Sequence, residues 1–256
     1  MTTLLQWRPH RRLVPEAMSL SEHLSELRRR VLIVALAFFT ASVVAFVFYP
    51  EILKFLQEPY CRISPHCQLY VTGPLDGLSL RIKIAAYGGL FLSLPVILWE
   101  LWRFITPGLH AREKRYAVPF VGSSLALFSI GVALAYVTFP HALRFLANVG
   151  GPSLDRLYDP NQYLGLIIAL MVVFGITFEL PVILVALELV GVVKAATLAA
   201  HRRWAFVLIV VLAAVITPSG DPFSMLALAV PLYVFYETSI VIGKLAERRR
   251  AATVIE

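Results

Sequence analysis

Three glutamates stand where a carboxylate needs a partner. Glu179 lies in the segment FGITFELPVIL, within an apolar stretch that meets no basic residue between Tyr163 and Lys194. An ionised carboxylate is costly in hydrocarbon, so Glu179 is expected to be protonated, hydrogen-bonded between helices, or in contact with a passing polar segment. Glu26 in SELRRR and Glu113 in AREKR lie among basic residues instead.

Glu26 and Glu113 allow two interpretations. The simpler is local pairing, because Glu26 and Arg30 are i,i+4 neighbours and Glu113 is flanked by Arg112 and Lys114. Exposed pairs of this kind contribute under ~1 kcal/mol. The alternative is that these carboxylates bind a cationic partner, since a guanidinium forms two parallel charge-assisted bonds with a carboxylate. Two separated carboxylates would then bind two adjacent arginines.

The composition places these carboxylates in a membrane protein. Hydrophobic residues make up 59% of the 256 positions, above the roughly half that is typical of soluble domains. Six apolar segments separated by short loops predict an all-α integral membrane protein with six transmembrane helices in a concave bundle. Their expected bounds are Val31–Tyr49, Ile84–Ile105, Ala117–Phe139, Leu164–Val190, Ala205–Thr217 and Phe223–Ile242.

The two C-terminal spans are expected to be short. Ala205–Thr217 covers only about 20 Å of a ~30 Å hydrocarbon core. The apolar part of the last span is interrupted by the charged residue Glu237. The turn Thr217–Asp221 exposes backbone groups that need cover from protein or water. We therefore expect either a locally thin bilayer or a turn that lies below the outer surface. Pro181 is expected to kink the fourth span.

Basic residues indicate the orientation. Most of the 23 Lys and Arg residues lie in the termini and in the loops on the same side, so the positive-inside rule places both termini in the cytoplasm. The basic residues that give the net charge of +7 lie mainly in these loops and termini and form no basic stripe interleaved with aromatic residues. This distribution argues against a nucleic-acid partner. Cys61 and Cys67 then lie outside, either as a disulfide or as two reduced thiols. No metal-ligand spacing accompanies them, and no cofactor is expected.

The regions outside the spans have their own predictions. Residues 1–17 are expected to be a disordered N-terminal extension, residues 18–245 the membrane domain, and residues 246–256 a cytoplasmic C-terminal tail. Ser19 and Glu22 have the spacing of a capping box, which predicts a short amphipathic helix at the interface before the first span. A second short helix is expected from Glu51 to Glu58.

Five segments resemble, in order, the signatures of the TatC family, the multispanning subunit of the twin-arginine protein translocase. They are HLSELRRR (His23–Arg30), LPVILWELWRFITPGL (Leu94–Leu109), REKR (Arg112–Arg115), FGITFELP (Phe174–Pro181) and TPSGDPFS (Thr217–Ser224). The resemblance implies a signal-peptide receptor and core subunit of that translocase. Such a protein exports folded proteins across a prokaryotic plasma membrane with the proton motive force.

The resemblance also implies partners and binding residues. By position, Glu26 and Glu113 match the family's signal-binding acids, with Arg28 and Phe104 in the same recognition surface. The expected partners are single-span TatA and TatB-type subunits and the twin-arginine signal peptides of folded cargo. Further copies of this chain and the lipid bilayer complete the set, without nucleic acid.

Other positions match the family on the membrane and outer sides. Glu179 matches the intramembrane glutamate, expected to offer a polar contact to a partner helix or to an inserted signal hairpin. Asp221 matches the acid of the outer turn and Pro59 the proline of the outer loop. The turn reads TPSGD where TPPD is commoner, and Met225 stands where many relatives have a glutamine.

Three other classes of protein make different predictions for these residues. An ion-coupled transporter of small solutes would use Glu179 as its proton site. A structural membrane scaffold would tolerate substitution of both Glu26 and Glu113. An enzyme is the least favoured, because the sequence contains no nucleophile with a base, no metal motif and no phosphate loop.

Overall fold

The fold was analysed in a computed structural model that describes residues 20–63, 67–105, 117–151 and 158–255. Every regular element in these ranges is an α-helix. The helices are α1 (Leu20–Val47), α2 (Tyr49–Cys61), α3 (Asp76–Ile105), α4 (Ala117–Val149), α5 (Pro160–Thr177), α6 (Leu180–Val190), α7 (Ala195–Ala200), α8 (Arg202–Ile216) and α9 (Pro222–Ile255). The predicted N-terminal extension and Glu113 lie outside the described residues.

Five helical segments are long and apolar enough to cross a membrane. They are Leu24–Val47, Asp76–Phe104, Val118–Val149, Pro160–Leu189 and Pro222–Glu247, and they confirm the prediction of an all-α membrane protein. Helix α8 has 15 residues, which extend over about 22 Å against a hydrocarbon core of ~30 Å. A crossing by α8, and with it the count of six spans, stays a prediction.

Two helices extend further than predicted. Helix α1 runs without a break from Leu20 to Val47, so the prediction of a separate amphipathic helix before the first span is wrong. Helix α9 has 34 residues and ends only at Ile255, so the last helix is not short and the segment predicted as a tail from residue 246 is helical. Hydrophobicity marks the lipid-embedded part of a helix, whereas backbone hydrogen bonding continues the helix into polar sequence.

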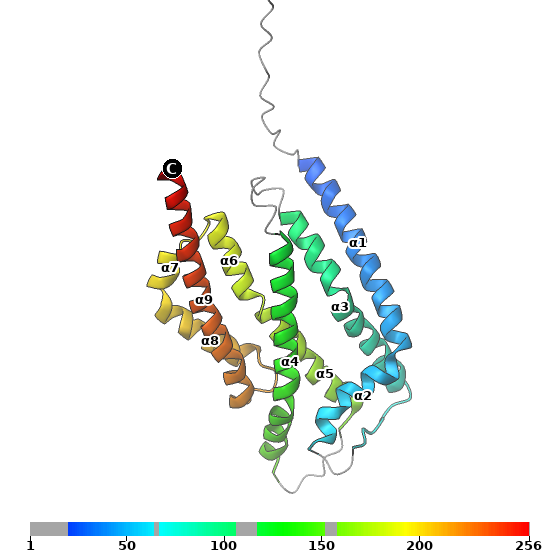
Figure 1. Ribbon diagram of the computed structural model, residues 1–256. Helices are drawn as coiled ribbons and strands as arrows, with labels where there is room; N and C mark the ends of the chain where they lie inside the picture. The colour runs from blue at the N-terminus through cyan, green and yellow to red at the C-terminus, as the bar shows by residue number, and fades with distance from the viewer. Residues whose placement is uncertain (1–19, 64–66, 106–116, 152–157, 256) are drawn as a thin grey trace, which may run out of the picture.

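The helices pack mainly in pairs around the fourth span. Figure 1 shows α1 beside α3 and α4 beside α5, while α6, α7 and α8 pack on α9. In the apolar part of Pro160–Leu189, 56% of the residues are buried, compared with 11% in the apolar part of Leu24–Val47. Leu164, Ile167 and Phe174 of α5 are fully buried together with Phe139 of α4. The fourth span is therefore the centre of the bundle, and α1 lies at its periphery.

Glycines set the closest approach of the paired helices. A Cβ atom at Gly89 of α3 would lie 2.0 Å from Ser42 Oγ and 2.7 Å from Ser42 Cα of α1. A Cβ atom at Gly131 of α4 would lie 2.7 Å from the carbonyl oxygen of Phe174. Small residues let helix backbones approach within a membrane, where packing holds helices together in place of the hydrophobic effect. These contacts fix α1 on α3 and α4 on α5.

The two ends of the bundle carry different groups. Helix α1 begins and α9 ends at the same end, called here the proximal end (Figure 1). The opposite, distal end holds α2. The turn between α8 and α9 lies short of the level that α4 reaches at the distal end (Figure 1). The position of this turn relative to the outer membrane surface stays a prediction.

Candidate functional sites

A cluster of three charged side chains joins α1 to α3 at the proximal end. Arg30 forms ion pairs with Glu26 of its own helix and with Glu100 of α3, where Nη1 lies 3.1 Å from Oε2. Arg30 Nη1 also donates to the Glu100 carbonyl oxygen at 3.4 Å. The side chains of Arg30 and Glu100 are 11% and 10% exposed, and that of Glu26 is 24% exposed. Two carboxylates thus share one guanidinium, and Glu26 is the more accessible of the two.

The structure confirms the predicted pairing of Glu26 with Arg30 and adds Glu100, which the sequence analysis missed. The signal was present, because Glu100 is the one acid in the apolar segment LPVILWELW, and the argument applied to Glu179 holds for it equally. A buried acid in a span needs a partner. Only the packing of α1 on α3 identifies that partner as Arg30.

The other residues assigned to the recognition surface are placed unequally. Phe104 is half-buried and follows Glu100 by one helical turn, so the two lie on the same face of α3. Arg28 is exposed, and two residues of helix turn its side chain to another face of α1 than that of Glu26. Glu113 lies outside the described residues. The structure therefore joins Glu26 to Glu100 through Arg30 and places Phe104 one helical turn from Glu100, but it does not bring Arg28 to the same face.

Glu179 lies at an interruption of the fourth span. The α5 helix ends at Thr177 and α6 begins at Leu180, with Pro181 unable to donate a backbone hydrogen bond. The predicted kink is confirmed. The half-buried carboxyl of Glu179 lies beside the buried Ser124 of α4, and its Oε1 atom is buried without a hydrogen-bond partner in the described part of the chain. The side chain therefore faces α4.

A second acid of the fourth span, Glu188, was not singled out from the sequence. It is 8% exposed, and neither of its carboxyl oxygens has a hydrogen-bond partner in the described residues. Gly243 of α9 makes room for it, since a Cβ atom there would lie 2.6 Å from the carboxyl atoms. Its burial follows from the packing of α6 on α9, which the local pattern LVALELVG does not reveal.

Asp221 closes the turn between α8 and α9. It is fully buried, accepts a hydrogen bond from the Ser219 hydroxyl at 2.5 Å and caps α9 by accepting from the Ser224 N–H at 2.7 Å. Gly220 adopts a positive φ of 59°, which glycine tolerates without strain. Thr217, Ser219 and Ser224 are buried as well. Protein therefore covers the polar groups of this turn, as one of the sequence-based alternatives required.

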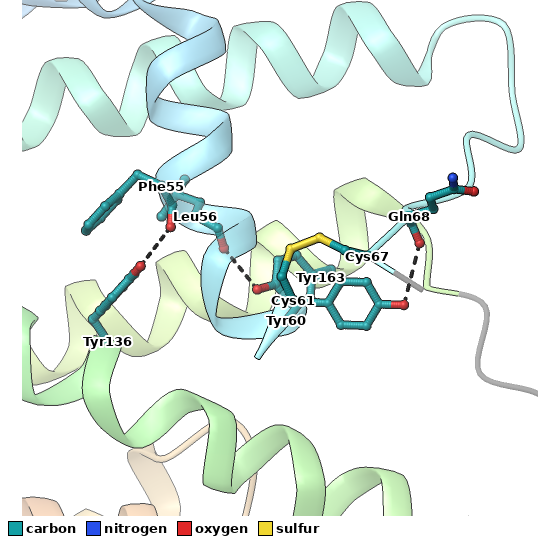
Figure 2. Close-up of a disulfide and its surroundings, with 8 residues drawn as sticks. All are labelled: Phe55, Leu56, Tyr60, Cys61, Cys67, Gln68, Tyr136 and Tyr163. Carbon is teal, nitrogen blue, oxygen red and sulfur yellow. Dashed lines mark hydrogen bonds between the residues drawn. A yellow bond between two sulfur atoms is a disulfide. The ribbon is translucent and has the colours of Figure 1, made fainter. Parts of the chain in front are cut away.

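Pro59 explains how α2 docks on the bundle. Because proline lacks an N–H, the Phe55 carbonyl one turn earlier has no helical donor at that position. The Tyr136 hydroxyl of α4 donates to this carbonyl at 2.9 Å (Figure 2). The Tyr163 hydroxyl of α5 donates to the next carbonyl, that of Leu56, also at 2.9 Å. The predicted short helix in the first loop is confirmed and extends from Tyr49 to Cys61.

A disulfide closes the loop after α2. It joins Cys61, the last residue of the helix, to Cys67 (Figure 2), so the oxidised one of the two states left open by the sequence is present. In the last turns of α2, Arg62 Nη2 lies 2.7 Å from Glu58 Oε1. The hydrogen bond from Arg62 and its positive charge hold the pKa of Glu58 below its usual value. Covalent and ionic contacts together fix this end of α2.

We expect Tyr136→Phe to lower the free energy of unfolding by about 1 kcal/mol, because the Phe55 carbonyl loses its donor. In Pro59→Ala the backbone N–H of residue 59 supplies a helical donor, so the same tyrosine substitution is expected to cost about half as much or less in that background. Thermal unfolding of the four proteins in detergent measures this coupling. Equal costs in the two backgrounds would show that Pro59 does not create the contact.

Comparison with known proteins decides the family. The family model for the Sec-independent protein translocase protein (TatC) matches residues 22–231. The chain is 43% identical to the Sec-independent protein translocase protein TatC of Frankia casuarinae, over 96% of this chain and 71% of that protein. The chain belongs to the TatC family. It is also 38% identical to the TatC of Aquifex aeolicus, over 91% of this chain and 98% of the relative.

A solved structure supports the same assignment. The crystal structure of a twin-arginine translocase receptor TatC aligns with a TM-score of 0.73 at 36% identity, covering 88% of this chain and all of that one. The family resemblance drawn from five short segments is thereby confirmed. The bundle described above is the TatC fold, and the chain is a protein of the Sec-independent translocation system.

Proposed function

We propose that this TatC protein is the receptor for twin-arginine signal peptides and a core subunit of the translocase that exports folded proteins. The observation that carries the proposal is the cluster of Glu26, Arg30 and Glu100. Two carboxylates with one guanidinium between them have a net charge of −1. The cluster therefore retains the capacity to bind a second cation, and it already binds one side chain of the required kind.

An arriving signal peptide would use the more exposed member of the cluster. The side chain of Glu26 is 24% exposed, whereas that of Glu100 is 10% exposed and is paired with Arg30. A signal arginine binds Glu26 through paired charge-assisted hydrogen bonds, and Phe104, one turn beyond Glu100, offers an aromatic face to the same peptide. Glu113, from the loop after α3, is assigned to the second arginine of the pair.

The partners follow from the same proposal. An apolar groove of about 530 Å³ lies between α6, α8 and α9, with Leu184, Leu208 and Leu232 among its lining residues. It suits a single-span helix of a TatA or TatB-type subunit, since helices in lipid associate by packing of apolar and small residues. Several copies of the chain assemble in a plasma membrane with both termini in the cytoplasm, and the proton motive force drives export without a nucleotide.

Glu179 is assigned the polar contact with a partner helix or an inserted signal hairpin. Its unpartnered Oε1 atom, close to Ser124 and buried between helices, supports this role, because a buried polar atom without a partner is costly until one is provided.

The function and the role of Glu179 are tested together by export of a folded reporter. In a host that lacks its own TatC but retains the small subunits, the wild-type chain is expected to restore export of a reporter with a twin-arginine signal. A reporter with paired lysines is the control and should remain inside. Glu179→Ala is expected to reduce the export rate about tenfold, the equivalent of one lost hydrogen bond to a polar group in a buried site.

The matched variant is Glu179→Gln, which keeps the hydrogen-bonding groups without the charge. Export by the glutamine variant near the wild-type rate assigns the role to hydrogen bonding, while a loss equal to that of alanine assigns it to the carboxyl itself. Full export by the alanine variant would remove Glu179 from the mechanism. Failure of the wild-type chain to export the reporter in a host with cognate small subunits would contradict the proposed function.

A further inference from the structure

A shallow groove lies between exposed apolar faces of α1 and α3, away from the sites described above. It has a volume of about 320 Å³. Phe38, Phe39 and Phe46 of α1 form its walls, and Ala85 and Ala86 of α3 leave it open because their side chains are small. Since α1 and α3 are antiparallel, the groove follows the helices from the distal end toward the middle of the bundle.

Arg81 stands at the distal mouth of this groove. It precedes Ala85 by one turn of α3. Its guanidinium carbon lies 4.3 Å from the centroid of the Phe46 ring and 5.3 Å from that of Tyr49. Phe46 thus contacts the cation and also lines the groove, so the charged and the apolar parts are continuous.

The charge of Arg81 has no anion to balance it in the described residues. Its contacts there are the two aromatic rings, and its Nε atom is buried without a hydrogen-bond partner. Neighbouring cations at this end are engaged differently. Arg62 pairs with Glu58 at 2.7 Å, and Lys83 donates to the Asn161 carbonyl oxygen at 3.0 Å. A half-buried guanidinium held on two ring faces still has donors that need an acceptor.

We propose that Arg81 and this groove bind an anionic phospholipid, with the phosphate on the guanidinium and one acyl chain in the groove. The site lies near the distal end of α3, within one turn or two of its start at Asp76, at the depth where aromatic and basic residues meet lipid headgroups. From Phe46 to Phe38 the groove follows about 12 Å of helix, which is most of one leaflet of a ~30 Å core.

The charge selects the lipid class. The phosphate charge of a zwitterionic lipid is balanced by the ammonium group of the same lipid. An anionic headgroup has a net negative charge and can therefore balance the positive charge of Arg81. One basic residue near the headgroups contributes about a fivefold preference for anionic lipid. The competing explanation is an arginine that only extends its side chain to water beside the membrane, which predicts no preference between lipids. This inference does not depend on the proposed receptor function.

The test is native mass spectrometry of the full chain in detergent, titrated with phosphatidylglycerol and with phosphatidylcholine of the same acyl chains. Arg81→Gln is expected to weaken binding of phosphatidylglycerol about fivefold and to leave phosphatidylcholine unchanged. Lys54→Gln removes an exposed cation of α2 at the same end and is the matched control, expected to change either lipid less than twofold. Thermal unfolding in lipid-free detergent identifies any variant that fails to fold.

A second variant separates the acyl chain from the headgroup. Ala86→Leu fills the groove and is expected to weaken both lipids, while Arg81→Lys retains the charge and most of the preference. Equal effects of Arg81→Gln and Lys54→Gln on phosphatidylglycerol would overturn the proposal. Equal affinity of the wild-type chain for the two lipids would also overturn it. The same holds if a polypeptide copurifies with the wild-type chain and Ala86→Leu removes this polypeptide without weakening lipid binding, because the groove would then bind the polypeptide.

Discussion

Glu26→Lys is expected to weaken binding of a twin-arginine signal peptide at least about a hundredfold. The substitution removes a charge-assisted pair worth about 1.5–3 kcal/mol, equivalent to roughly 10- to 150-fold, and sets a cation against the arriving arginine. Glu26→Gln removes the charge without the repulsion, so its loss is expected to be nearer tenfold. Binding of a labelled signal peptide to the detergent-solubilised protein gives both dissociation constants.

Two controls make this result specific. Glu51→Gln removes an exposed acid from α2 at the opposite end of the bundle and is expected to leave the dissociation constant unchanged. A peptide with paired lysines should lose less on Glu26→Gln, because lysine cannot form the paired hydrogen bonds of a guanidinium. Arg30 keeps its contact with Glu100 in either Glu26 variant, so the fold is expected to persist. Unaltered affinity of Glu26→Lys would reduce the cluster to a link between α1 and α3.

The second large effect is expected for Gly89→Ala, which should lower the free energy of unfolding by about 3 kcal/mol. The added methyl group would meet the backbone of α1 at Ser42 Cα, 2.7 Å away, and a backbone cannot turn aside as a flexible side chain does. Helix α1 must therefore move from α3. Because the same interface holds Arg30 against Glu100, we also expect weaker binding of the signal peptide in this variant.

Gly77→Ala is the matched control on the same helix, because a Cβ atom there meets nothing within 4 Å. It is expected to change the free energy of unfolding by less than about 1 kcal/mol. Because alanine has a higher helix propensity than glycine, the expected change is stabilising. Thermal unfolding in detergent compares the two variants. If Gly89→Ala and Gly77→Ala unfolded at the same temperature, the close approach of α1 to α3 would not depend on the absence of a side chain at Gly89.

Patterns that act over one or two helical turns were predictable from the sequence. The ion pair of Glu26 with Arg30 follows from i,i+4 spacing, and the interruption at Glu179 follows from Pro181. The partners of Glu100 and Glu188 could not be predicted, because each depends on a helix distant in sequence. The same holds for Gly89 and Gly243, whose importance comes from the atoms that face them. Hydrophobicity located the helices but not their ends, since α1 and α9 continue beyond lipid through charged residues.

The interruption at Phe178 and Glu179 leaves the two halves of the fourth span with different neighbours. Helix α5 packs on α4 and α6 packs on α9, while α4 and α9 also contact each other. A backbone without a continuous helical ladder can change its dihedral angles at these two residues. A shift of α6 relative to α5 would alter the separation of Glu179 from Ser124, but the contact of α9 with α4 would have to change with it. The position of the Glu179 carboxyl is therefore coupled to the packing of α9 on α4.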